Sequence, residues 1–140
     1  GGFSMKKLLL GWLAVFVALS VLDYLIHGLI LSSTYEQLKE VFRPDMMDKM
    51  WIYSLVAAIT SFFFVLIYSK GYEGKGIMEG VRYGLYVGAM LSTGMAYGSY
   101  ASYAIPYSLA IQWFLFGMAE YVVAGVVVSL IYGKKEGAAA

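Results

Sequence analysis

The sequence contains four apolar segments that are each long enough to cross a membrane, separated by short polar connections. An α-helix rises about 1.5 Å per residue, so about 20 apolar residues span the hydrocarbon core of a bilayer. The segments lie at about 8–32, 46–68, 76–100 and 107–132. Backbone polar groups inside lipid must pair within their own segment, and helices meet this requirement. The pattern predicts an all-α integral membrane protein, an antiparallel four-helix bundle that forms a single transmembrane domain over 1–140.

Composition supports this assignment and excludes several function classes. Only 14% of the residues are charged and 61% are hydrophobic, whereas soluble domains have roughly 25% charged residues. A net charge of +1 provides no basic surface for nucleic acid, and the absence of cysteine excludes disulfides and thiolate metal sites. No G-x-S-x-G, H-E-x-x-H or phosphate-binding glycine loop occurs. The sequence therefore leaves open whether the protein is an enzyme, and it identifies no cofactor.

Three segments lie outside the predicted spans. Residues 1–4 precede Met5 and are expected to be an expression remnant, as are residues 138–140. The stretch of about 34–43 has apolar residues at helical spacing and polar residues on the opposite side. We expect a short amphipathic helix there, lying in the plane of the lipid headgroups and ended by Pro44. Asp45 is expected to cap the second span.

The distribution of basic residues predicts the orientation in the membrane. Short cytoplasmic segments carry an excess of lysine and arginine. One side of the predicted bundle holds both chain ends and the 69–75 connection, with Lys6, Lys7, Lys70, Lys75, Lys134 and Lys135. The other side has fewer basic residues, Lys39, Arg43 and Lys49. Both termini are therefore expected to face the cytoplasm.

Small residues recur at every fourth position of the third span: Gly76, Gly80, Gly84, Gly88, Ser92 and Ala96. Rows of this G-x-x-x-G type let two membrane helices approach closely, because lipid provides no hydrophobic driving force between helices. The row predicts close contact either with another helix of the same chain or with a second copy. Four spans enclose little interior, so we expect a dimer or small homo-oligomer.

Ionisable groups at membrane depth form the principal candidate site. Each costs roughly 2.5–3.5 kcal/mol at the centre of a spanning helix, so each needs a partner or a function. Asp23 and His27 share a face of the first span, and Glu120 lies at a similar depth on the fourth, with Ser20 and Gln112 nearby. Carboxyl and imidazole groups together bind protons or cations. We interpret them as a site for a proton, cation or small ligand, used in binding or transport.

Two alternatives remain open for these residues. Asp23, His27 and Glu120 would also suit a divalent metal, which would make the protein a metal-dependent membrane enzyme that acts on a lipid-like substrate. In the second alternative Asp23 and His27 simply pair, and the protein is a structural or lipid-binding subunit without chemistry. The sequence does not distinguish these readings.

A second polar group lies near the start of the third span. Glu79 and Arg82 are three residues apart, and Tyr83 follows. The expected arrangement is a self-neutralised ion pair near the interface, with the arginine reaching towards the headgroups. The alternative is a role in binding an anionic ligand or a lipid headgroup.

Several short motifs resemble those of a family of small, four-helix, uncharacterised prokaryotic inner-membrane proteins. They are His27-Gly28-Leu29-Ile30-Leu31, Arg43-Pro44, Gly71-Tyr72-Glu73-Gly74-Lys75 and Glu79-Gly80-Val81-Arg82-Tyr83-Gly84. The resemblance spans Met5 to Lys135 and implies a four-helix fold in the cytoplasmic membrane, with the lipid bilayer as partner. It implies no activity and transfers no catalytic residue.

Overall fold

The computed structural model describes residues 3–138, and over this range the chain is helical without a β-strand. Residues 1–2 and 139–140, which include parts of the expected expression remnants, lie outside the described residues. The elements are α1 (Met5–Asp23), the π-helix η1 (Tyr24–Ile30), α2 (Ser32–Gln37), the 3-10 helix η2 (Met46–Lys49), α3 (Met50–Gly71), α4 (Ile77–Ser102) and α5 (Tyr107–Tyr132).

Three helical segments within residues 3–138 are long and apolar enough to cross a membrane, Met5–Ile30, Met46–Gly71 and Tyr107–Tyr132. These segments suggest a membrane protein. Helix α4 also has 26 residues. Its glycines, serines and tyrosines, together with Glu79 and Arg82, lower its mean hydropathy below that of the other three.

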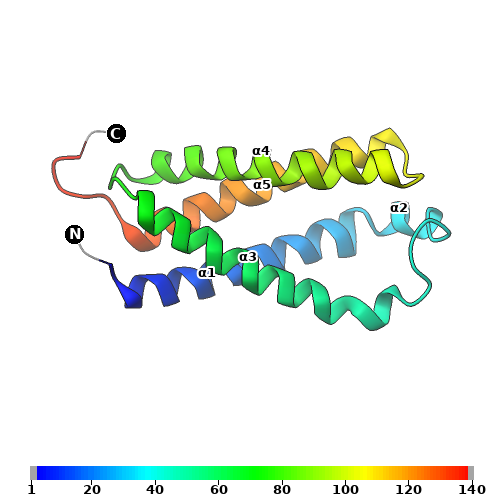
Figure 1. Cartoon of the computed structure of the whole chain (residues 1–140), viewed down its shortest axis with the longest axis horizontal. Helices are drawn as coiled ribbons and strands as arrows, with labels where there is room; N and C mark the ends of the chain where they lie inside the picture. Colours follow the sequence, from blue (N-terminus) through cyan, green and yellow to red (C-terminus); the bar gives the residue numbers. More distant parts are fainter. Residues whose placement is uncertain (1–2, 139–140) are drawn as a thin grey trace.

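Helices α4 and α5 run side by side (Figure 1) and pack backbone against backbone. A Cβ atom added to Gly80 would lie 2.1 Å from the carbonyl oxygen of Gly125, and one added to Gly84 would lie 2.2 Å from that of Tyr121. Gly88 is also buried against α5. Of the two partners predicted for the glycine row, the structure therefore has the helix of the same chain. Gly76 lies just before α4, and the atoms near a Cβ added to it belong to the side chain of Lys134.

Two apolar clusters form the core. The terminal cluster, near the chain ends, contains Leu8, Val15, Leu19, Phe64, Val65, Tyr68, Ala124, Val128 and Tyr132 from α1, α3 and α5. The distal cluster contains Ile26, Leu31, Ile105, Leu109 and Ala110. Helix α3 is held against α1 by the indole of Trp12, which donates a 2.9 Å hydrogen bond to the carbonyl oxygen of Ala58.

The predicted amphipathic helix is shorter than expected. Helix α2 begins at Ser32 and ends at Gln37, so the prediction of 34–43 is wrong at both ends. From Leu38 the chain turns, because its apolar side chains fold back onto the bundle. The ring of Phe42 meets the ring of Tyr35 edge-on at 5.6 Å. Asp45 does not cap the following helix; its carboxylate instead pairs with Arg43 and Lys49.

The first span is not one uniform α-helix. At Tyr24 it widens into the π-helix η1, which ends with a hydrogen bond from the amide of Leu31 to the carbonyl oxygen of Ile26. Such π segments are rare and are frequent at functional sites. The change of helix type falls directly after Asp23, within the candidate site.

Both described chain ends and the α3–α4 connection lie at the same end of the molecule (Figure 1). The hydroxyl of Tyr72 donates to the carbonyl oxygens of Tyr132 and Gly133 at 2.9 and 2.6 Å. The amide of Lys135 donates to the carbonyl oxygen of Gly74 at 2.9 Å. These contacts fasten the segment after α5 to the α3–α4 connection.

Candidate functional site

The three ionisable residues predicted to form a site meet in the structure. Asp23 ends α1, His27 lies in η1, and Glu120 lies in α5. One carboxylate oxygen from each acid and one ring nitrogen of His27 all lie within 4.8 Å of one another. Glu120 is buried with 8% exposure, whereas Asp23 and His27 are partly exposed. The site therefore combines one buried acid with two partly exposed groups.

This polar group lies at the junction of the two apolar clusters. Along the first span, Asp23 lies between Leu19 of the terminal cluster and Ile26 of the distal cluster. Along α5, Glu120 precedes Ala124 of the terminal cluster by one helical turn. Apolar packing on both sides keeps bulk water away from the carboxyl groups, which strengthens electrostatic interactions between them.

His27 is positioned by a residue from outside the helical spans. Its Nδ1 atom lies 2.5 Å from the hydroxyl oxygen of Tyr35, in α2. The same oxygen accepts a 2.7 Å hydrogen bond from Nε1 of Trp113, in α5. The rings of His27 and Tyr35 are stacked with an interplanar angle of 16°. A chain of hydrogen bonds thus joins α5, α2 and η1 and fixes the imidazole.

The donors in this series of hydrogen bonds bear on which nitrogen of the imidazole carries the proton. The indole N–H of Trp113 can only donate, so Tyr35 accepts from it and keeps its own proton, which it can donate to Nδ1 of His27 in the Nε2-protonated tautomer. Burial raises the pKa of the Tyr35 hydroxyl to about 12, so this proton is retained. When Nδ1 accepts, a neutral imidazole carries its proton on Nε2. Nε2 is then the ring nitrogen available to the carboxyl groups.

Two other residues predicted for the site do not join it through hydrogen bonds. The side-chain amide of Gln112 turns back on its own helix and donates to the carbonyl oxygen of Ser108 at 2.9 Å. Ser20 lies on α1 one turn before Asp23, and within the described chain no hydrogen bond from its hydroxyl reaches the carboxyl groups. The site is therefore reduced to Asp23, His27 and Glu120.

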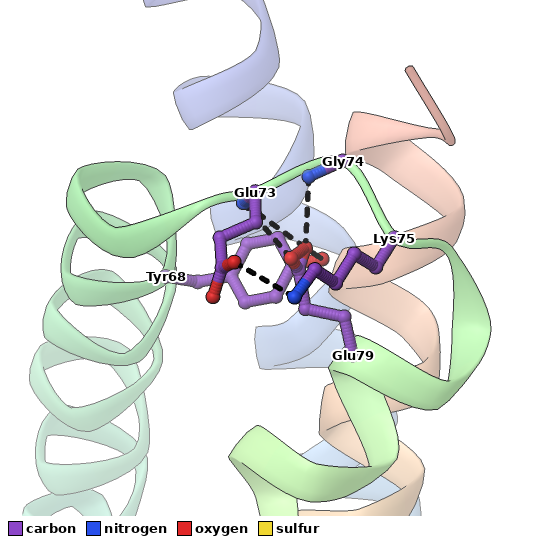
Figure 2. Close-up of polar contacts among 5 residues, drawn as sticks. All are labelled: Tyr68, Glu73, Gly74, Lys75 and Glu79. Atoms are coloured by element: carbon purple, nitrogen blue, oxygen red, sulfur yellow. Dashed lines mark hydrogen bonds and ion pairs between the residues drawn. The ribbon is translucent and has the colours of Figure 1, made fainter. Parts of the chain in front are cut away.

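The expected ion pair between Glu79 and Arg82 is absent among the described residues. The Glu79 carboxylate instead accepts hydrogen bonds from the hydroxyl of Tyr68 and from the backbone amides of Glu73 and Gly74, at 2.8–3.3 Å (Figure 2). Donors from the end of α3 and from the loop therefore converge on one carboxylate. The loop amides compete well with Arg82 for the Glu79 carboxylate, because the short connection fixes their position whereas an arginine side chain is flexible.

Tyr83, the third residue of the secondary group, is also engaged within the bundle. Its hydroxyl donates a 2.6 Å hydrogen bond to the carbonyl oxygen of Phe64, and its ring lies 4.6 Å from the ring of Phe64. This contact joins α4 to α3. Tyr83 is accordingly a packing residue in the structure.

Tyr35 is the important residue that the sequence analysis did not assign to the site. Its spacing indicated only the apolar face of an amphipathic helix, and the structure does place it among the side chains packed on the distal cluster. Tyrosine combines an apolar ring with a polar hydroxyl, so a tyrosine on a buried face needs a hydrogen-bond partner. That requirement was the one signal that could have connected Tyr35 to His27.

No protein-family model matches this chain, and no curated protein or solved structure matches it. The resemblance to small four-helix inner-membrane proteins therefore stays a prediction. Function must be inferred from the residues themselves.

Proposed function

We propose that this protein is a small polytopic membrane protein that reversibly binds a proton, or a small cation in its place, at Asp23, His27 and Glu120, as a step in binding or transport. The observation that carries the proposal is the approach of two carboxyl groups and one imidazole to within 4.8 Å, between two apolar clusters. Intramembrane ionisable groups in such surroundings commonly mark ion or proton pathways.

A proton is the ligand that best fits the hydrogen bonds. Two carboxylates this close repel each other when both are ionised, and a shared proton removes the repulsion. In the tautomer in which Nδ1 of His27 accepts from Tyr35, the ring has an N–H group at Nε2 that the carboxyl groups could accept. A metal would require the lone pair of Nε2 and would leave the Tyr35 proton without this acceptor.

The proposal includes a fourth membrane crossing by α4 and an orientation with both termini in the cytoplasm of a prokaryotic cell. Helix α4 has the same 26-residue length as α5 and packs along it. The lysines at the end that bears both termini support the orientation, since basic segments stay on the cytoplasmic side. Asp23, His27 and Glu120 would then lie within the bilayer.

Proton uptake into liposomes that contain the purified protein tests this function. An acid pulse should acidify wild-type liposomes faster than those containing Asp23→Asn or Glu120→Gln. Gln112→Leu is the matched control, because this neighbouring side chain bonds only to its own helix. Equal uptake by the wild type, both site variants and protein-free liposomes would contradict transport.

A metal-dependent enzyme is the second candidate, favoured by the presence of three potential ligand atoms of suitable types. Elemental analysis of purified protein distinguishes it from the first. Stoichiometric zinc, manganese or iron that is lost in His27→Ala would support the enzyme and oppose the proton site. A purely structural subunit predicts that apolar replacements of Asp23 and Glu120 change assembly only.

A further inference from the structure

A groove lies between α3 and α4 at the end of the molecule that bears the chain termini. It has a volume of about 300 Å³ and is separate from the Asp23 site. Its lining combines four charged side chains, Glu73, Lys75, Glu79 and Arg82, with apolar surface that includes Ile67 and Tyr86. A groove that is polar at one end and apolar along its wall has the shape of an amphiphile site.

Three of the four charged groups in the groove already have partners. The ammonium of Lys75 lies 2.9 Å from the Glu73 carboxylate. The Glu79 carboxylate is occupied by Tyr68 and by two amides of the loop, as Figure 2 shows. Both carboxylates of the groove therefore have partners within the protein.

Arg82 is the remaining charge. Within residues 3–138 its guanidinium forms neither an ion pair nor a hydrogen bond, although the residue is partly buried. A guanidinium presents a planar fork of N–H donors that matches the oxygens of a phosphate group and binds them in pairs. Among the described residues that line the groove, Arg82 is therefore the charged group available to an anion with several oxygens.

The wall of the groove indicates the rest of the ligand. The side chains of Ile67 and Tyr86 are 57% and 70% exposed, and they face outward on helices that the membrane would surround. The chain ends and the 69–75 connection, which lie at this end of the molecule, carry six lysines. Such a concentration of basic residues is expected close to anionic lipid headgroups. We propose that the groove binds a phospholipid, with its phosphate on Arg82 and its acyl chain along Ile67 and Tyr86.

Equilibrium binding of phosphatidylglycerol in mixed micelles, followed by native mass spectrometry, tests this site. Arg82→Gln should raise the Kd about tenfold, which corresponds to about 1.4 kcal/mol. Arg43→Gln is the matched control, because that exposed guanidinium pairs with Asp45 outside the groove. Diacylglycerol, which lacks the phosphate, should bind the wild type and Arg82→Gln equally.

Two further arms keep the test decisive. Inorganic phosphate at the concentration of the lipid should leave the lipid bound, and displacement by it would overturn the assignment to a lipid. Tyr86→Ala changes an exposed wall position, so it should fold like the wild type and still weaken lipid binding severalfold. An unchanged Kd in both Arg82→Gln and Tyr86→Ala would overturn the proposal.

Discussion

The hydroxyl oxygen of Tyr35 lies 2.5 Å from Nδ1 of His27, although the two residues belong to different helices. Because Trp113 donates to the same oxygen, the hydroxyl is held from two sides. A partner of this kind selects the tautomer and the orientation of an imidazole, as second-shell groups do in proton and metal sites. Tyr35 therefore holds the orientation of the imidazole that meets Asp23 and Glu120.

Replacing Tyr35 by phenylalanine should release the imidazole. The change removes the donor to His27 and the acceptor of Trp113, so the free energy of unfolding should fall by about 1–3 kcal/mol. Nitrogen NMR of the imidazole should show the Nε2-protonated tautomer in the wild type and a mixture of tautomers in the variant. Tyr103→Phe is the control, since that residue is 64% exposed and does not act on Tyr35. An unchanged imidazole spectrum in Tyr35→Phe would show that Tyr35 does not select the tautomer.

Replacing a glycine of α4 by alanine should lower the free energy of unfolding only where α5 covers that glycine. Gly84→Ala would place a methyl group 2.2 Å from the carbonyl oxygen of Tyr121 and must push the helices apart. We expect a loss of about 1–3 kcal/mol in the free energy of unfolding, the usual effect of overpacking. Gly94→Ala, on the same helix with no atom within 4 Å of the added group, should cause no loss. Equal stability of the two variants in thermal unfolding would contradict the packing described here.

Removing the Glu79 carboxylate should loosen the α3–α4 connection. Glu79→Ala deletes the acceptor of the Tyr68 hydroxyl and of the Glu73 and Gly74 amides, so it should lower the free energy of unfolding by about 1.5–3 kcal/mol. Hydrogen exchange at these two amides should accelerate. Glu40→Ala is the control, because Glu40 is exposed. Unaltered exchange at the loop amides would exclude the proposed role of Glu79 in holding the loop.

The Arg43–Asp45 pair should respond to acid. The hydrogen bond from Arg43, at 2.9 Å, holds the pKa of Asp45 below its ordinary value of 3.8. Since the pKa is lower in the folded than in the unfolded chain, the pair stabilises the fold above pH 3.8, and this contribution is lost as the pH falls through the folded pKa. Carbon NMR of the Asp45 carboxyl group should report the low pKa, and Arg43→Gln should raise it. A pKa indifferent to Arg43→Gln would contradict the pairing.

The helices were predictable from apolar length, and the meeting of the three ionisable groups was predictable from helical spacing together with their depth along the spans. Apolar length alone predicts spanning helices, and the span 107–132 coincides with α5. Asp23 and His27 are four residues apart, so one face of any helix carries both. The depth of Glu120 followed from counting residues along antiparallel helices. The packing of Gly80 and Gly84 likewise follows from their regular spacing, although the sequence could not tell which helix would cover them.

The remaining features depend on contacts between segments that the sequence does not specify. The π-helix after Asp23 contains Gly28 but no proline, and its sequence does not mark Tyr24 as the point where the hydrogen-bond spacing changes. The prediction that Glu79 pairs with Arg82 was wrong, because Arg82 competes for the Glu79 carboxylate with the amides of the loop. The turn at Gly74, where φ is +76°, fixes the position of these amides. Which of several nearby donors binds a carboxylate depends on where the fold places each donor.

Infrared difference spectroscopy of the protein in lipid at neutral pH tests the central claim most directly. We expect a carbonyl band of a protonated carboxylic acid in the wild type, because on the proposed function the two acids that meet His27 would share a proton. Glu120→Gln should remove the band, Asp23→Asn should shift it, and Gln112→Leu should leave it unchanged. A wild-type spectrum without this band, or a band unaltered by Glu120→Gln, would contradict the proposed proton site.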